Sequence, residues 1–168
     1  DAHEPAVREA IAFTLAEQIR QAAQWRGTPG FKPSKLNELR ALYPLPHNVT
    51  FDFAKSAERA VWIDERARRA RTVMAEICGR TVLGHTDWSL KHFRFVGDRV
   101  AIVYDWDSLK LEDELHVLGI AAATFTSSWD IPVKLTPSQE EALAFVQAYE
   151  RHRGRPFTRD ELRKVGAS

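Results

Sequence analysis

Residues 85–107 read HTDWSLKHFRFVGDRVAIVYDWD and carry the strongest structural signal in the chain. Apolar and polar side chains alternate through the second half of this stretch, a period of two that is typical of β-strands. Gly97 interrupts the alternation and can take the positive φ that a tight hairpin turn needs. We therefore expect a short β-hairpin over about 92–105. It would bring Asp87, which precedes the hairpin, close to Asp105 at its end.

Two carboxylates placed in this way suggest a particular chemistry. Asp87 and Asp105 are 18 positions apart, and they converge in space only if the hairpin closes. One carboxylate to orient a nucleophile and another to hold a metal ion on phosphate are the minimum equipment for phosphoryl transfer. The alternative is an ordinary surface hairpin with acidic residues at its ends.

The motifs around these carboxylates point to a known family. They are His85-Thr86-Asp87 and, after the hairpin, Val103-Tyr104-Asp105-Trp106-Asp107. In this order and spacing they resemble the catalytic core of the aminoglycoside phosphotransferase and choline kinase-like family, which has a protein-kinase-like fold. The resemblance is strongest over 82–107 and continues more loosely through the later helices, including residues 145–150 and Arg153-Gly154. It implies an α+β fold, predominantly α: the helical C-terminal lobe of such a kinase with one catalytic hairpin.

The resemblance also implies roles for individual residues. Asp87 would be the catalytic base, or the group that orients the acceptor hydroxyl or amine. Asp105 would bind the Mg²⁺ that bridges the ATP phosphates, and His85 would brace the loop from behind. Asp107 would either add an indirect contact to the metal site or be a solvated acid. Trp88 and Trp106 are expected to be packing residues rather than substrate platforms.

The chain departs from the family pattern at His92, which occupies the position of a metal-binding asparagine. Mg²⁺ prefers oxygen ligands and tolerates imidazole poorly. Three outcomes are open. His92 ligates the metal with a preference for Mn²⁺, or it holds a metal-bound water, or the second metal is missing and activity is weak. We favour a working site with altered metal handling.

A second departure concerns the N-terminal lobe of these kinases, which covers the nucleotide. The chain has no Gly-x-Gly-x-x-Gly run, and no strand with a nucleotide-binding lysine precedes residue 85. We therefore expect residues 1–168 to form a single domain, the C-terminal lobe alone, as a fragment or a truncation. Because half of the nucleotide cleft would be missing, we expect little ATP turnover from these residues by themselves.

Composition limits the classes of partner. The chain has 168 residues and a net charge of +1, with 44% hydrophobic and 28% charged residues, which are values of an ordinary globular domain. This charge gives no reason to expect nucleic acid or a membrane surface as a partner. No apolar run is long enough to span a bilayer and there is no signal peptide, so the cytoplasm is the default location. The single cysteine, Cys78, excludes an internal disulfide, and we expect it to be buried on a helix.

Apolar side chains at helical spacing predict helices over most of the remaining chain. We expect helices over 4–26, 34–42, 57–78, 114–126, from Thr136 to about 152, and a short last one after Thr158. The helix over 57–78 should bury one stripe of residues: Ala60, Val61, Ala67, Ala70, Met74 and Ile77. Four arginines on its outer side are expected to form a solvated face pairing with Asp64 and Glu65, rather than a phosphate patch: Arg66, Arg68, Arg69 and Arg71.

The helix over 114–126 is apolar nearly all round and should be buried. Thr136 and Thr158 each begin a capping pattern, with Gln or Glu three residues later. We expect the helix after Thr136 to bury Leu143, Phe145, Val146 and Tyr149, and Gly154 to end it. Acidic residues on the later segments suit a cationic small-molecule substrate: Glu112, Asp113, Glu114, Asp130, Glu140 and Glu141.

Two other functions compete with the kinase. The first is a degenerate kinase-like binding module, which His92 and the missing lobe favour. The second is a metal-dependent hydrolase with Zn²⁺, Mn²⁺ or Fe²⁺ bound by four side chains: His85, Asp87, His92 and Asp105. The other histidines show no ligand spacing, which argues against the hydrolase.

Overall fold

Two antiparallel strand pairs frame the loop that carries Asp87. The computed structural model describes residues 1–33, 42–43, 52, 60–128 and 132–168. In the first pair, β1 (Thr81–His85) runs beside β4 (Leu109–Asp113), with His85 opposite Leu109. In the second, β2 (Phe93–Val96) runs beside β3 (Arg99–Val103), with Phe93 opposite Val103. The chain passes from β1 to β2 through the loop that carries Asp87, and from β3 to β4 through the segment that carries Asp105. The two strand pairs therefore hold both ends of each loop.

The hairpin expected over 92–105 is confirmed as β2 and β3. Gly97 has a φ of 58° in the turn, a left-handed conformation that glycine adopts without a steric cost. The pairing shifts register between Arg94 and Phe95. The pairing of β1 with β4 was not expected from the sequence.

Helices make up most of the described structure, which is mixed α and β with helix predominating. The α-helices are α1 (Pro5–Ala22), α3 (Val61–Glu76), α4 (Glu114–Thr124), α5 (Gln139–Arg153) and α6 (Arg159–Val165). Within the described residues there are also three single-turn 3₁₀ helices: η1 (Ala23–Trp25) follows α1, whereas η5 (Leu90–His92) and η6 (Trp106–Ser108) precede β2 and β4. The helix expected over 34–42 lies outside the described residues, apart from residue 42. None of the described helices has the length and apolar character that a membrane span requires.

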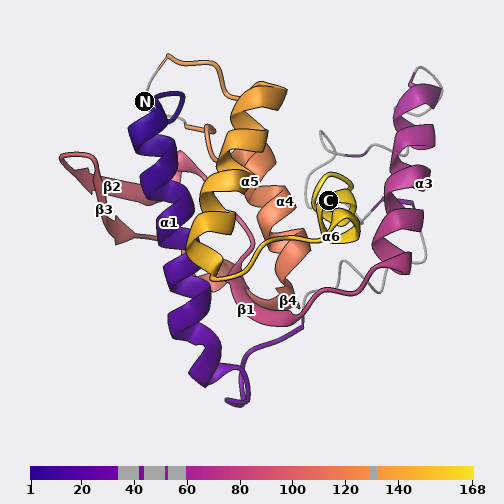
Figure 1. Ribbon diagram of the computed structural model, residues 1–168, viewed down its shortest axis with the longest axis horizontal. Coiled ribbons are helices and arrows are strands. Elements are labelled where there is room, and N and C mark those ends of the chain that lie inside the picture. The colour runs from indigo at the N-terminus through magenta and orange to yellow at the C-terminus, as the bar shows by residue number, and fades with distance from the viewer. Residues whose placement is uncertain (34–41, 44–51, 53–59, 129–131) are drawn as a thin grey trace.

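The core forms around α4, as its apolar sequence predicts. Leu115, Val117, Leu118 and Ala121 are fully buried, on different sides of this helix. Helices α1 and α5 lie side by side and run in the same direction (Figure 1). Their N-terminal ends are joined by His3 and Glu141, and further along Glu9 accepts a hydrogen bond from Arg151. Burial of the apolar side chains of α4 and of the core around it supplies the main stabilisation of the fold.

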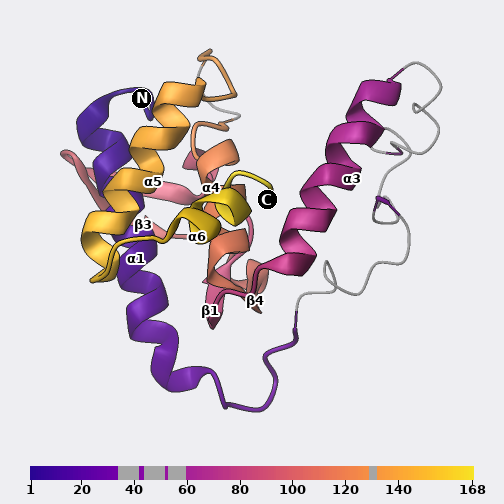
Figure 2. The same ribbon diagram turned by 45° about the vertical axis from the view of Figure 1, so that its right-hand side comes forward.

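Helix α3 differs from the sequence-based expectation. It stands apart from α1, α4 and α5, and it contacts α6 (Figure 2). None of its residues is buried, and Val61 is 57% exposed. The prediction that this stripe is buried is therefore wrong: Val61 is exposed and the other five residues are only partly buried, although Ile77, just after the helix, packs against the core. Arg68 lies 3.7 Å from Asp64, in agreement with a solvated, ion-paired face.

Three smaller expectations also need correction. Cys78 is exposed rather than buried, because α3 ends at Glu76 and the chain continues in an extended conformation. Helix α5 is capped by Ser138, not Thr136: Ser138 and Glu141 form the reciprocal capping box. Leu143 is 56% exposed on the outer side of this helix. The capping box at Thr158 and the left-handed Gly154 are confirmed.

The packing of α4 against the C-terminal end of α6 gives a testable prediction. A Cβ atom on Gly119 would lie 2.5 Å from the carbonyl oxygen of Val165 and 2.4 Å from Cβ of Ser168. Gly119→Ala should therefore lower the free energy of unfolding by about 1–3 kcal/mol, despite the higher helix propensity of alanine. Denaturant unfolding measures this change. Gly27→Ala is the control and should cause no loss, because no atom lies within 4 Å of the added Cβ; equal effects in the two variants would contradict this packing.

Candidate metal centre

The closed hairpin brings Asp87, His92 and Asp105 together. The backbone N–H of Tyr104 donates to the carbonyl oxygen of His92 at 2.9 Å, which places the two ends of the hairpin side by side. One ligand atom from each of the three side chains lies within 4.8 Å of the others. The sequence predicted the approach of Asp87 to Asp105 and named His92 as a candidate metal ligand, and the structure brings the three side chains together.

His92 links the two carboxylates through one ring nitrogen. Its Nε2 lies 3.1 Å from Oδ2 of Asp87 and 3.7 Å from Oδ2 of Asp105. The His92 side chain is 15% exposed, whereas those of Asp87 and Asp105 are 41% and 34% exposed. The cluster is therefore half-buried, and solvent or a ligand reaches it from the side of the carboxylates.

His85 lies behind the cluster and ties both carboxylate-bearing segments to β1. Its Nδ1 accepts a hydrogen bond from the backbone N–H of Asp87 at 3.2 Å, so the ring proton is on Nε2, which lies 3.1 Å from the carbonyl oxygen of Tyr104. Burial lowers the pKa of His85, which is fully buried. These are the contacts of a residue that braces the loop. With both nitrogens engaged, the ring is not available as a metal ligand.

The Asp87 carboxylate is held in a cationic environment. Partial burial by itself would raise the pKa of Asp87, but hydrogen bonds from Lys91 and His92 lower it below the usual value. Nζ of Lys91 lies 2.9 Å from Oδ2 of Asp87. The carboxylate is therefore ionised at neutral pH and can accept a hydrogen bond or a proton.

Asp105 occupies a strained backbone position. Its φ of 64° and ψ of 43° are left-handed, and among the described residues other than glycine it alone has a positive φ. Oδ2 accepts a hydrogen bond from the Ser108 hydroxyl at 2.6 Å. This bond is the largest cause of a lowered pKa for Asp105. The backbone conformation and the serine together aim an ionised carboxylate at His92.

Aromatic residues pack around His85. Trp88 is fully buried, and its indole N–H donates to the carbonyl oxygen of Ile11 at 3.3 Å, so it is a core residue as expected. Trp106 is 51% exposed, and its ring centroid lies 6.0 Å from that of His85. Asp107 is exposed on η6 and does not belong to the cluster of three.

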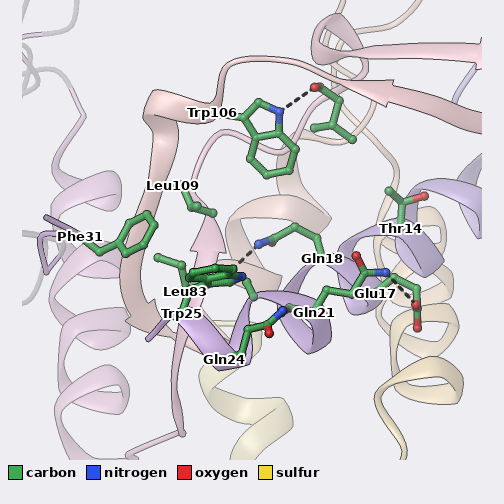
Figure 3. A pocket seen from close by; sticks show the side chains of 12 residues that line it. Thr14, Glu17, Gln18, Gln21, Gln24, Trp25, Phe31, Leu83, Trp106 and Leu109 are labelled. Atoms are coloured by element: carbon green, nitrogen blue, oxygen red, sulfur yellow. Dashed lines mark hydrogen bonds between the residues drawn. The ribbon is translucent and has the colours of Figure 1, made fainter. Parts of the chain in front are cut away.

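A cavity of about 420 Å³ borders Trp106 on the side of α1. Figure 3 shows Trp106 on one side of this cavity and Trp25 with Phe31 on the other. The amide of Gln18 donates to the carbonyl oxygen of Leu83 at 3.0 Å between them. The volume is in the range of small-ligand sites. None of the three clustered residues lines this cavity, so it neighbours the cluster without being part of it.

The acidic residues suggested for a cationic substrate have mostly structural contacts. Glu114 is buried between Arg80 and Arg153. Asp113 lies 2.7 Å from Nζ of Lys164 and caps α4. Glu112 is buried, Glu141 completes the cap of α5, and Asp130 lies outside the described residues. Of the group, Glu140 is exposed on the first turn of α5, so these acids do not form one substrate pocket.

The cluster suits a divalent ion in its ligand types and its size. Two carboxylates and an imidazole are ligands of Mn²⁺, Fe²⁺ and Zn²⁺, and the carboxylates also suit Mg²⁺. Atoms bound to one such ion lie at most about 4.2 Å apart, which is close to the observed separation. Small rotations of exposed carboxylates would bring the atoms within range.

Two contributors to the site were not identified from the sequence. Lys91 lies in the loop before the hairpin, four residues after Asp87, and η5 turns it back onto that carboxylate. Ser108 reaches Asp105 because η6 closes a single turn there. The spacing of Lys91 was a usable signal, whereas the left-handed conformation of Asp105 was not visible in the sequence.

Comparison with known proteins adds no assignment to this geometry. No protein-family model matches the chain, and no curated protein matches it.

Proposed function

We propose that the chain is the C-terminal lobe of an ATP-dependent phosphotransferase acting on a hydroxyl or amine of a small molecule, like the aminoglycoside phosphotransferases. The observation that supports it is the convergence of Asp87, His92 and Asp105, with ligand atoms within 4.8 Å of one another. The order of these residues along the chain and their placement at the two ends of one hairpin agree with the kinase-like motifs.

In this proposal each residue has a distinct task. Asp87, which is ionised beside Lys91, accepts a hydrogen bond from the hydroxyl or amine of the small molecule. This bond directs the lone pair of that hydroxyl or amine at the γ-phosphorus of ATP or another NTP. Asp105 and His92 hold Mg²⁺ or Mn²⁺, and a divalent ion bound there supplies neutralisation of the phosphate oxygens. Lys91 adds a positive charge 2.9 Å from Asp87, where the transferring phosphoryl group would lie. His85 fixes both loops, so that alignment rather than covalent chemistry provides the rate enhancement.

Nucleotide binding then requires a partner. We propose that an N-terminal lobe of the kind found in these kinases, not contained in these 168 residues, covers the triphosphate, and that this chain alone turns over ATP weakly or not at all. The acceptor is a small molecule, and a cationic one is compatible with the two carboxylates. The cytoplasm is the proposed compartment, since ATP is available there.

The substitution His92→Asn tests how the site handles its metal. Asparagine supplies a carbonyl oxygen, a harder ligand that Mg²⁺ prefers to imidazole. Transfer with Mg²⁺ should stay the same or rise by up to about tenfold, while the advantage of Mn²⁺ over Mg²⁺ should shrink. Initial rates with each metal, compared between the variant and the parent, measure both effects. Loss of activity with both metals would contradict the proposed role of His92.

The deciding experiment uses this chain together with the proposed nucleotide-covering lobe. Transfer of the γ-phosphoryl group of ATP to a panel of small alcohols and amines, with Mg²⁺ or Mn²⁺ present, would support the proposal. Metal-dependent ATP binding without transfer to any acceptor would favour the degenerate module. Stoichiometric transition metal in the purified protein, with hydrolysis and no ATP binding, would favour the hydrolase.

The degenerate module has a structural observation in its favour, besides His92 and the missing lobe. Oδ2 of Asp87 is contacted by both Lys91 and His92, so an acceptor must compete with these groups or use Oδ1. Oδ1 lies 3.5 Å from the Ser89 hydroxyl and is the freer oxygen. We favour the active enzyme because this second oxygen can still meet a substrate.

A further inference from the structure

A second charged site lies at the other end of β1 from the metal centre. It is a cavity of about 130 Å³ between the C-terminal halves of α1 and α5, which lie side by side (Figure 1). Val82, near the start of β1, contributes to its wall, whereas His85, at the end of the strand, braces the metal centre. This cavity is called here the arginine cavity. Its basic lining residues are Arg20, Arg26, Arg80, His152 and Arg153.

The arginine cavity has an excess of positive charge. Its remaining lining residues are Ala16, Ile19, Ala23, Val82 and Tyr149, so the described lining includes four arginines and no carboxylate. Glu114 lies behind the wall and is shared between Arg80 and Arg153, both of which bond it with two nitrogens. Arg153 also lies 3.6 Å from Glu161, which pairs with the exposed Arg155 as well, so two carboxylates serve three guanidinium groups at this point.

Arg26 adds to the excess of positive charge in the arginine cavity. Its Nη1 donates to the carbonyl oxygen of Thr81 at 3.1 Å, and its Nε donates to that of Ala23 at 3.2 Å. Both acceptors are neutral, and within the described part of the chain no carboxylate contact is recorded for this guanidinium. Arg20 pairs with Glu17 on the exposed side of α1. The arginines thus outnumber the carboxylates that contact them.

Arg153 also has an unused donor. Its side chain is 1% exposed, and the buried Nη1 has no hydrogen-bond partner within the described residues. A buried donor without a partner is costly, particularly on a charged group. The guanidinium stacks on Phe157, with Cζ 3.8 Å from the ring centroid, so its plane is fixed. Within the described residues this donor of the guanidinium therefore stays unused.

Basic residues at helix C-termini have an ordinary explanation that covers part of this cluster. Cations there interact favourably with the helix macrodipole, and this accounts for Arg20 on α1 and His152 on α5. It does not account for Arg80, which precedes β1, or for the burial of Arg153. The ion pairs with Glu114 account for these two arginines in part. Arg26 has neither explanation, because its guanidinium turns back onto the start of β1 and bonds neutral carbonyl oxygens.

We propose that the arginine cavity binds a phosphate group. Guanidinium groups bind phosphate through paired, charge-assisted hydrogen bonds. The volume corresponds to a few water molecules of about 30 Å³ each, which is enough for one tetrahedral oxyanion and too small for a whole nucleotide. The phosphate is either free inorganic phosphate or the terminal group of a small phosphomonoester. None of Asp87, His92 and Asp105 lines this cavity, so the site is independent of the proposed phosphotransferase chemistry.

Thermal unfolding and calorimetric titration of this chain test the proposal. Inorganic phosphate is titrated at constant ionic strength with NaCl, so that general screening stays the same; glycerol 3-phosphate and acetate are titrated in parallel. Saturable binding of phosphate or the phosphomonoester, with a rise in Tm and a clear preference over acetate, is the expected result. Whichever of the two binds more tightly identifies the source of the phosphate group.

Charge-matched variants make the test specific. Arg26→Gln and Arg20→Gln leave the Glu114 network intact and should each weaken phosphate binding about fivefold or more. Arg163→Gln is the control: this residue lies on α6, outside the arginine cavity, and is about half exposed, and its loss should leave the affinity unchanged. Absence of saturable binding, equal affinity for acetate, or equal weakening by Arg163→Gln would overturn the proposal.

Discussion

Glu114→Gln is expected to lower the free energy of unfolding at pH 7 by about 3–5 kcal/mol, a large part of the total stability of a domain this size. The carboxylate of Glu114 is 1% exposed and accepts hydrogen bonds from Arg80, Arg153 and the Tyr149 hydroxyl. Its removal leaves the buried guanidinium of Arg153 without its main counter-ion. Glu161, 3.6 Å away, compensates for only part of this loss.

Glu17→Gln is the matched control, because it removes a carboxylate from an exposed ion pair with Arg20. Exposed pairs of this kind contribute about 0–1 kcal/mol. Urea unfolding followed by circular dichroism measures both variants. Equal destabilisation by the two substitutions would show that Glu114 is not the electrostatic centre of the helical core.

The same residue determines a pH dependence with a definite sign. Burial alone would raise the pKa of Glu114, but the hydrogen bonds from Arg153 and Arg80 lower it to about 2, from 4.5 when unperturbed. The stabilisation is therefore complete above pH 4.5 and is lost as the pH falls towards 2, which corresponds to about 3 kcal/mol. The difference in stability between the parent and Glu114→Gln should accordingly shrink over this range. A difference that stays constant from pH 7 to pH 2.5 would contradict the assignment.

Asp87→Asn is expected to lower phosphoryl transfer about 10²–10⁴-fold when this chain acts together with the proposed nucleotide-covering lobe. The amide has no charge to attract the acceptor proton, and it also loses the ion pair with Lys91. Affinity for the metal–ATP complex should change much less, because we assign the metal to Asp105 and His92. The effect should therefore appear in kcat rather than in the KM for ATP.

Asp98→Asn provides the control for that experiment. Asp98 is exposed in the turn at the opposite end of the same hairpin, so the substitution removes an equal charge from the same element. Its kcat should match that of the parent. An Asp87→Asn enzyme within about threefold of the parent would exclude Asp87 as the group that activates the acceptor.

The site was more predictable than the fold around it, for a physical reason. Strand alternation and the turn at Gly97 are local signals, and closure of a hairpin necessarily brings its two ends together. The approach of Asp87 to Asp105 followed from these signals alone. The pairing of β1 with β4 depends instead on contacts between residues far apart in the sequence, and the glycine at position 84 weakened the strand pattern of residues 81–85.

Helix boundaries show the same division between local and tertiary causes. Thr136 and Ser138 both fit the capping pattern, since Gln139 and Glu141 each follow three residues later. Ser138 is the cap in the structure because Glu141 closes the reciprocal bond and also contacts His3 of the N-terminal segment. For α3, the apolar spacing was present, but the sequence could not show that the described elements cover this face only in part.

The most direct test of the metal centre is electron paramagnetic resonance of Mn²⁺ added to this chain, with electron spin echo detection of ligand nitrogen. We predict one bound Mn²⁺ per chain, coupled to an imidazole nitrogen. The coupling should disappear in His92→Asn, and the affinity should fall at least tenfold in Asp105→Asn. Free Mn²⁺ at stoichiometric protein concentrations, or a nitrogen coupling that survives in His92→Asn, would contradict a metal site formed by His92 and Asp105.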